Sequence, residues 1–200
     1  MKAKRSIILL ASLLLTAALV GYAGVLVVYN FEVSSTSTSA PISLVAGTNA
    51  GATDLGNNTI TVTVTGNYSA TIEVHPTYAP TYYFDVLGIA DNIAGDGNYS
   101  AKICVETPIN SANYTVANLY LYNATNGTYV DLDTTDIVIS PLDLTVAGCS
   151  STIVLIDGYS YYFVFELQVA DGTTVNTTDT FSIGLYYSPN AADLGNTLPP

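Results

Sequence analysis

The chain has 200 residues, only 10% of them charged, and its formal net charge is −12. Three of the four basic residues stand in the first five positions, MKAKR, so from Gly24 onwards one basic residue minus sixteen acidic ones leaves −15. Such a surface cannot neutralise phosphates, which excludes nucleic acid as a partner and favours cations. Once a targeting segment is removed, the length suits one domain with a sizeable core.

The N-terminus has the pattern of a secretion signal. The basic MKAKR precedes an apolar run from Ser6 to Val20, and the small residues in Gly21-Tyr22-Ala23 predict cleavage after Ala23. Residues 1–23 are therefore predicted to be a signal peptide, and the mature protein is expected to be extracellular, contacting the membrane only during export. If nothing is cleaved there, Ser6 to Tyr29 is an uncharged apolar stretch long enough to span a bilayer.

Residues 24–40 combine an apolar strand with a polar linker. The strand alternates from Val25, and β-branched and aromatic residues replace the helix-like Leu and Ala of the preceding run. The stretch SSTSTSAP that follows is typical of flexible, extended chain. A strand on such a tether could be added to an open sheet in a neighbouring subunit, and this head-to-tail contact generates a filament. One face of the predicted donor strand holds Val25, Val27, Tyr29, Phe31 and Val33.

Residues 41–200 are predicted to form an all-β domain, a jelly-roll-like antiparallel β-sandwich. Short stretches with a period of two recur about every ten residues, bounded by Gly, Asn, Asp or Pro, and no helical repeat follows Tyr29. The longest stretch places Tyr161, Phe163, Phe165, Leu167 and Val169 on one face. The predicted strands are TITVTVT, ATIEV, TYYFDVL, AKICVE, TVANLYLYN, TYVDL, DIVIS, LDLTV, STIVLI, YSYYFVFELQV and FSIGLYYS.

The residues with catalytic or redox chemistry are few. Cys104 and Cys149 are predicted to form a disulfide because export leads to an oxidising compartment; two buried free thiols are the alternative. His75, the only imidazole, lies next to Pro76 at a strand end, and no GxSxG or similar nucleophile motif accompanies it. We expect His75 to be a structural turn or surface residue, and we expect the protein not to be an enzyme.

Carboxylates gather in two loops that could hold a cation. ADNIAGDGN contains Asp91 and Asp96, and DLDTTD contains Asp131, Asp133 and Asp136. Oxygen ligands of this kind suit Ca²⁺, although neither loop matches the full twelve-residue calcium motif and such residues commonly just form turns. These five aspartates are the candidate metal ligands, and no other cofactor is predicted.

Asn-x-Ser/Thr triplets are unusually dense. Seven in one exported domain, mostly in turn-like contexts, predict a surface that carries glycans at several of them. The candidate acceptors are Asn57, Asn67, Asn98, Asn113, Asn123, Asn126 and Asn176.

The order of these features resembles a known family. A signal segment, an apolar strand, a polar spacer and APISLVAG (Ala40–Gly47) precede a β-domain that ends in IDGYSYYFVFELQVADG and TFSIGLYYSP. This layout resembles the TasA/camelysin-related biofilm-fibre subunits, especially the archaeal bundling-pilus and thread proteins. The resemblance implies a homopolymer of jelly-roll domains joined by donor-strand complementation, with Val25–Val33 inserted into the preceding subunit. The bacterial members have a more polar, FSDTA-like sequence where this chain has YNFEVSS.

Two other interpretations remain open from the sequence. An archaeal type IV pilin would be cut after Arg5 and keep Ser6–Tyr29 as a helix, although Ser6 is not the usual Gly or Ala and the run from Val25 fits a strand better. A membrane-anchored, glycosylated surface protein would keep the same segment as an anchor.

Overall fold

The computed structural model describes residues 40–93, 95–132, 141–173 and 178–195. Contacts divide the chain into residues 1–38 and 39–200, and every described residue belongs to the second unit. Several predictions therefore lie outside the described residues: the signal peptide, the donor strand with Val25, Val27, Tyr29, Phe31 and Val33, the aspartates Asp133 and Asp136, and the sequon at Asn176.

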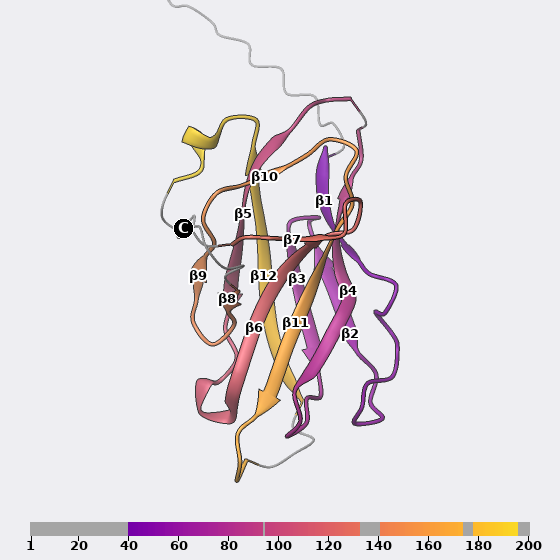
Figure 1. The fold of residues 1–200 in the computed structure, drawn as a ribbon, viewed down its shortest axis with the longest axis vertical. Helices are drawn as coiled ribbons and strands as arrows, with labels where there is room; N and C mark the ends of the chain where they lie inside the picture. The colour runs from indigo at the N-terminus through magenta and orange to yellow at the C-terminus, as the bar shows by residue number, and fades with distance from the viewer. Residues whose placement is uncertain (1–39, 94, 133–140, 174–177, 196–200) are drawn as a thin grey trace, which may run out of the picture. The chain divides into compact units, whose positions relative to one another are not determined.

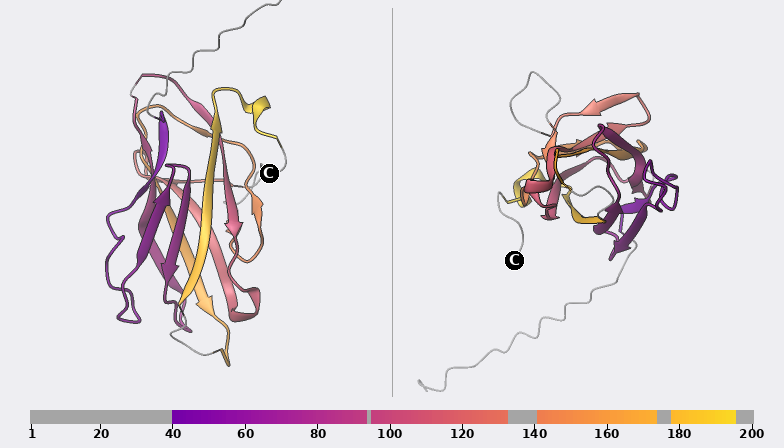
Figure 2. Two further views of the ribbon diagram at one scale, coloured as in Figure 1. Left: turned by 180° about the vertical axis from the view of Figure 1, so that it is seen from behind. Right: turned by 90° about the horizontal axis from the view of Figure 1, so that it is seen from below.

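The described residues form a β-sandwich of two antiparallel sheets, which confirms the predicted all-β class (Figures 1 and 2). The front sheet, which faces the viewer in Figure 1, has the order β1-β4-β11-β6-β7, with β8 beside β6. The back sheet, which faces the viewer in the left panel of Figure 2, has the order β10-β5-β12-β3-β2, with β9 beside β5.

Seven of the described strands are short, and five have nine or more residues. The front strands are β1 (Ile42–Ala46), β4 (Thr81–Asp91), β6 (Tyr114–Asn123), β7 (Thr128–Val130), β8 (Leu142–Asp143) and β11 (Tyr161–Val169). The back strands are β2 (Thr61–Thr65), β3 (Ser69–Val74), β5 (Tyr99–Thr107), β9 (Gly148–Cys149), β10 (Ile153–Leu155) and β12 (Asp179–Ser188). Two single 3₁₀ turns, η1 (Ser111–Asn113) and η2 (Ala191–Asp193), complete the described chain, in which no helix is long and apolar enough to cross a membrane.

The core lies between the two sheets and is built from the alternating positions. The predicted inward face of β11 is buried throughout, from Tyr161 to Val169. Phe165 of the front sheet packs edge-on against Phe181 of the back sheet, with ring centroids 5.1 Å apart. Aromatic burial of this kind is the main stabilising contribution in a sandwich.

Two strands were not predicted, for different physical reasons. In β1 the first three residues, Ile42 to Leu44, are all buried, so the expected alternation is absent. β9 has only two residues and pairs through the disulfide partner Cys149. The predicted strand LDLTV is also shorter than expected, because pairing ends at Asp143 and a turn follows.

Candidate functional site

One edge of the front sheet is only partly paired. β11 runs along one side of β4 from Thr81 to Ile89. On the other side, β1 pairs with β4 only from Leu87 to Asp91. Among the described residues, no strand therefore pairs with Thr81–Val86 on that side. The carbonyls of Phe84, Asp85 and Val86 accept from Asn49 and Gly47 of the β1–β2 connection, so the free edge is Thr81–Tyr83.

The path of the chain at Gly47 explains why β1 ends where it does. Asp85 has a φ of 49°, and around it four residue steps along β4 match two along β11, so the strand bulges. The Gly47 N–H donates to the Val86 carbonyl at 2.8 Å, and a Cβ on Gly47 would lie 2.1 Å from the Asp85 carbonyl oxygen. Thr48 Oγ1 then donates to Asp85 Oδ2 at 2.5 Å, and Asn49 N donates to the Asp85 carbonyl at 2.9 Å, so the chain crosses the bulge instead of continuing as a strand.

Beside the free edge lies a cleft of about 330 Å³, called here the β4 cleft. The connection between β1 and β2 borders it, and the cleft reaches down to Ile60 and Val86, which belong to the core. Leu55 lines the cleft and is 74% exposed. Asn49 Nδ2 donates to the Phe84 carbonyl at 2.7 Å, so an added strand would extend the edge from Tyr83 towards Thr81 or displace this side chain. The cleft thus combines backbone and apolar groups of the kind that accept an added strand.

A buried hydroxyl at the floor of the cleft is left without a hydrogen bond. Tyr83 is 3% exposed, and its Oη makes no hydrogen bond with the described residues. Burial raises the pKa of Tyr83, and the charge of Asp54 raises it further. An unsatisfied buried hydroxyl destabilises the isolated domain.

His75 has a structural role beside this cleft. Its Nδ1 lies 2.9 Å from Asp54 Oδ2, and its Nε2 lies 3.9 Å from Glu73 Oε1. The prediction of a surface or turn position is wrong in one respect, because His75 is only 7% exposed. Asp54 belongs to the β1–β2 connection. The local sequence does not predict that this connection packs against His75.

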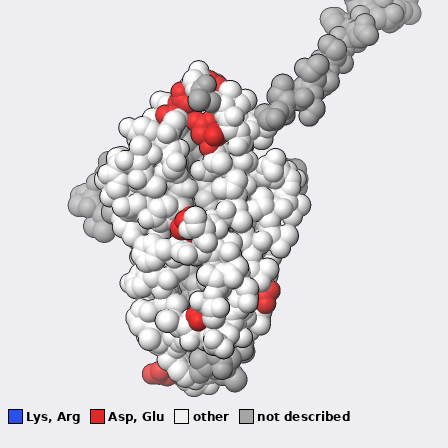
Figure 3. Space-filling model, turned by 90° about the vertical axis from the view of Figure 1, so that its right-hand side faces the viewer, with Lys and Arg blue, Asp and Glu red and all other residues white. Residues whose placement is uncertain are grey.

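The side of the domain that carries β1 and β4 has no basic residue in view and few acidic ones. Figure 3 shows no Lys or Arg on this side of the described domain, and its Asp and Glu residues gather mainly towards one end. An apolar strand could therefore approach the edge without removing many charged groups from water.

Three carboxylates converge on the surface, and two of them were predicted. Single carboxylate oxygens of Asp91, Asp96 and Asp157 lie within 4.8 Å of one another. Asp157 was missed because its Asp-Gly sequence indicates only a turn, and Asp131 is not part of the group. Hydrogen bonds from Gly158 N and then Ile93 N hold the pKa of Asp91 below its usual range.

Backbone donors account for this convergence without a cation. Gly158 N donates to Asp91 at 2.9 Å, and Gly95 N donates to both oxygens of Asp157. Asp96 accepts from the Tyr99 hydroxyl at 2.7 Å. The calcium site at these residues stays a prediction.

The six described sequons differ in accessibility. Four acceptor side chains are exposed and Asn113 is half-buried. Asn123 is only 4% exposed, and its Oδ1 accepts from Thr125 N at 3.0 Å and Asn126 N at 3.3 Å, so little of this side chain is accessible for attachment of a glycan. The exposed acceptors are Asn57, Asn67, Asn98 and Asn126.

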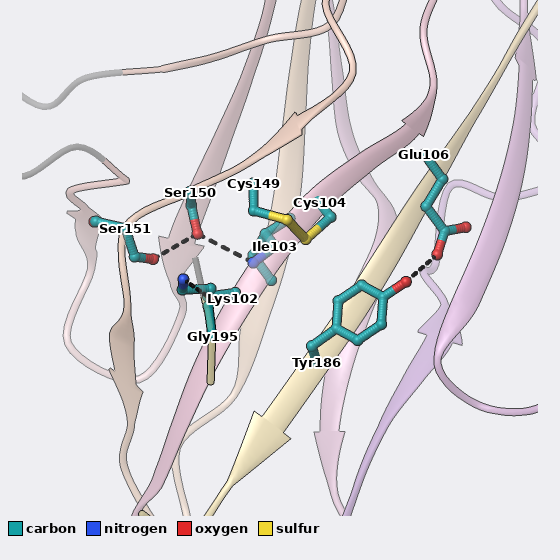
Figure 4. Close-up of a disulfide and its surroundings, with 9 residues drawn as sticks. All are labelled: Lys102, Ile103, Cys104, Glu106, Cys149, Ser150, Ser151, Tyr186 and Gly195. Carbon is teal, nitrogen blue, oxygen red and sulfur yellow. Dashed lines mark hydrogen bonds between the residues drawn. A yellow bond between two sulfur atoms is a disulfide. The ribbon is translucent and has the colours of Figure 1, made fainter. Parts of the chain in front are cut away.

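The predicted disulfide is present at the opposite side of the sandwich (Figure 4). Cys104 of β5 and Cys149 of β9 are direct cross-strand partners. Beside them Lys102 is only 8% exposed, and its Nζ donates to the Gly195 carbonyl at 2.5 Å. A pocket of about 470 Å³, mostly apolar, lies between the disulfide and Leu194.

No protein-family model matches the chain, and no curated protein matches it.

Proposed function

We propose that this protein is a non-enzymatic structural subunit of an extracellular filament, built by donor-strand complementation between copies of the chain. The donated strand is Val25–Val33, and the acceptor is the β4 cleft with the free edge from Thr81. The observation that carries the proposal is the incomplete pairing of β4. The resemblance to TasA-related fibre and bundling-pilus subunits supports the same assembly, with cell adhesion or biofilm formation as its role.

The pattern of the donor segment fits this acceptor. A strand laid against β4 places alternate side chains towards the core and the others on the outer face. Val25–Val33 offers an uninterrupted apolar set at every second position and grows polar on the other face at Asn30 and Glu32. Its apolar side chains would fill the cleft over Ile60, and its backbone would pair with the free edge of β4.

The distance between the start of the described chain and the acceptor edge favours a chain of subunits over a closed pair. The described chain begins at Ala40, whose carbonyl accepts from Asn92 Nδ2 at 2.9 Å, beside the Asp91 end of β4. The free edge lies towards Thr81, ten residue steps or about 33 Å away along the strand. A contact that joins opposite ends of two copies is heterologous and extends into a filament.

The donor side is tested by placing charge on the apolar face. We expect Val27→Asp with Phe31→Asp to leave folded monomers, because two carboxylates cannot be buried in the cleft without partners. Asn30→Asp adds charge on the polar face and is the matched control, which should still form filaments. Normal filaments from the double variant, seen by electron microscopy, would overturn strand donation.

The acceptor side is tested by Leu55→Asp, which adds charge to the cleft at an exposed position. Val146→Asp changes an apolar residue of similar exposure, 60%, that does not line the cleft, and it should polymerise normally. Mixing the Leu55→Asp subunit with the donor double variant should give heterodimers, because each supplies the half that the other lacks. If the mixture stays monomeric in analytical ultracentrifugation, the two segments are not partners.

N-terminal sequencing of mature protein separates the remaining interpretations. A start near Gly24 supports strand donation, a start at Ser6 supports a type IV pilin, and an intact Met1 supports a membrane-anchored surface protein.

A further inference from the structure

The outer face of the back sheet has a pocket beside the disulfide. On β5, Lys102 and Cys104 alternate with the core residue Ile103, so their side chains point away from the front sheet. The segment after η2 passes over these side chains, and its residues Leu194 and Gly195 border a pocket of about 470 Å³. This cavity, called here the Lys102 pocket, shares no lining residue with the β4 cleft.

Most of the wall of the Lys102 pocket is apolar. The Cys104–Cys149 disulfide forms one part of this wall (Figure 4), and the half-buried Leu194 forms another. Tyr186 also lines the pocket, and its hydroxyl donates to Glu106 at 2.8 Å, so this hydroxyl already has an acceptor. A concave, mostly apolar site of this volume is typical of sites that bind small molecules.

The pocket holds one basic group with unused hydrogen-bond donors. Lys102 is 8% exposed, and its Nζ donates to the Gly195 carbonyl. An ammonium group has three donors, yet Lys102 makes no further hydrogen bond and no ion pair within the described part of the chain. A buried ammonium group without a counter-ion is costly, so the pocket favours an anionic ligand.

The surroundings of Lys102 limit the charge of that ligand. Asp193 borders the pocket, is exposed, and accepts from Ser188 Oγ at 3.0 Å, so it adds a negative charge at the rim. This charge and the net charge of −12 would repel a multiply charged anion such as a phosphate monoester. A ligand with one negative charge and an apolar part matches both Lys102 and the wall.

We propose that the Lys102 pocket binds a monocarboxylate with an apolar tail, of the kind found in medium-chain fatty acids. The carboxylate accepts charge-assisted hydrogen bonds from Lys102 Nζ, which are stronger than bonds between neutral groups. The tail packs on the disulfide and on Leu194, which removes apolar surface from water. This binding does not depend on filament formation, because the pocket lies at the opposite side of the sandwich from the β4 cleft.

The test titrates the protein with octanoate in a calorimeter. Two further probes have the same tail and a different head group: 1-octanol is uncharged, and octylammonium is cationic. Octanoate should bind at least about tenfold more tightly than 1-octanol, and octylammonium should not bind. Binding of 1-octanol as tight as that of octanoate would overturn the proposed role of Lys102.

Substitutions separate the head group from the tail. Lys102→Met keeps the apolar stem and removes the charge, so it should weaken octanoate binding about tenfold or more and leave 1-octanol binding unchanged. Lys102→Arg should still bind octanoate. Leu194→Ser should weaken both probes, whereas Leu55→Ser, which changes an exposed leucine outside the pocket, should weaken neither. Circular dichroism checks that each variant is folded.

A spectroscopic test leaves the pocket itself unchanged. Because the chain has only three lysines, Lys2→Arg with Lys4→Arg leaves Lys102 as the single lysine. Labelling this chain with ¹³C-lysine gives one Cε signal, which octanoate should shift and octylammonium should not. The proposal is overturned if octanoate neither binds nor shifts this signal, or if the folded Lys102→Met variant binds octanoate as tightly as the unsubstituted protein.

Discussion

The two sheets carry the same pairing of a glutamate with a tyrosine on their outer faces, in opposite surroundings. On the back sheet, Glu106 accepts from Tyr186 and Ser69 and would contact any Cβ placed on Gly184, so the site is tightly packed. On the front sheet, Glu166 accepts from Tyr82, which is 52% exposed, and from Tyr120, which is half-buried.

The edges of the two sheets also differ in how fully they are covered. On one side of the back sheet, the disulfide links β5 to β9. After β12 the chain forms η2 and continues to Gly195, whose carbonyl accepts a hydrogen bond from Lys102 Nζ. On the front sheet, no described strand pairs with one side of β4 from Thr81 to Val86, and the Tyr83 hydroxyl is buried without a hydrogen bond to the described residues. The β5 side of the back sheet is thus covered by contacts within the chain, while the β4 edge of the front sheet keeps backbone groups that an outside partner can satisfy.

The largest effect should follow from opening the back sheet. Replacing Cys104 and Cys149 together by serine should lower the free energy of unfolding by about 2–4 kcal/mol, because the 45-residue loop is no longer closed in the unfolded chain. Urea denaturation measures the loss, and a reducing agent should not destabilise the double variant further. An unchanged midpoint would mean that the disulfide does not hold this sheet.

A pair of glycines compares the two edges directly. Gly47→Ala at the front edge should lower the free energy of unfolding by about 1–3 kcal/mol, because the new Cβ would clash with the Asp85 carbonyl and the chain must shift. Gly148→Ala on β9 meets nothing within 4 Å and should change stability by less than about 0.5 kcal/mol. Equal losses for the two variants in thermal unfolding would contradict the tight crossing at Gly47.

Alkaline pH should act on both faces alike. Burial, with hydrogen bonds to Glu166 and Glu106, raises the pKa of Tyr120 and of Tyr186 to about 12, against an ordinary 10. The folded state keeps these protons longer, so the stability is present below pH 10 and is lost as pH rises through 12. Each ring should contribute less than about 1 kcal/mol because both are screened by solvent.

Phenylalanine variants isolate this effect. Tyr120→Phe and Tyr186→Phe should each make the urea midpoint fall less steeply above pH 10. If neither variant changes the slope, these hydroxyls are not responsible for the alkaline loss.

The smallest effect is expected from calcium. If Asp91, Asp96 and Asp157 bind Ca²⁺, a millimolar concentration should raise the melting temperature by about 2 °C, since the carboxylates are already hydrogen-bonded. Asp157→Asn should remove the shift, whereas Asp143→Asn, elsewhere on the surface, should not. The same melting temperature with calcium and with a chelator would mean that these three carboxylates do not bind calcium.

The sequence predicted the buried strand faces that follow from alternation of apolar and polar residues. The buried face of β11 and the apolar face at Ile72 and Val74 follow directly from a period of two. The disulfide followed from the compartment that the signal segment predicts. These features are local, or they depend on a single pairing of residues.

The candidate site required tertiary information. The β4 cleft exists because the Asp85 bulge and Gly47 end the β1 pairing halfway along β4, and nothing in ISLVAG indicates that endpoint. The convergence of Asp157 with Asp91 depends on which loops meet at one end of the sandwich.

The burial of Lys102 also determines how readily trypsin cleaves the domain. From residue 6 onwards it is the only Lys or Arg, so trypsin has one target bond in the domain, between Lys102 and Ile103. That bond lies inside a paired strand, with Ile103 fully buried. Trypsin can therefore cut the domain only when β5 opens. Because this single cut gives two known fragments, the rate at which they appear reports the opening of β5.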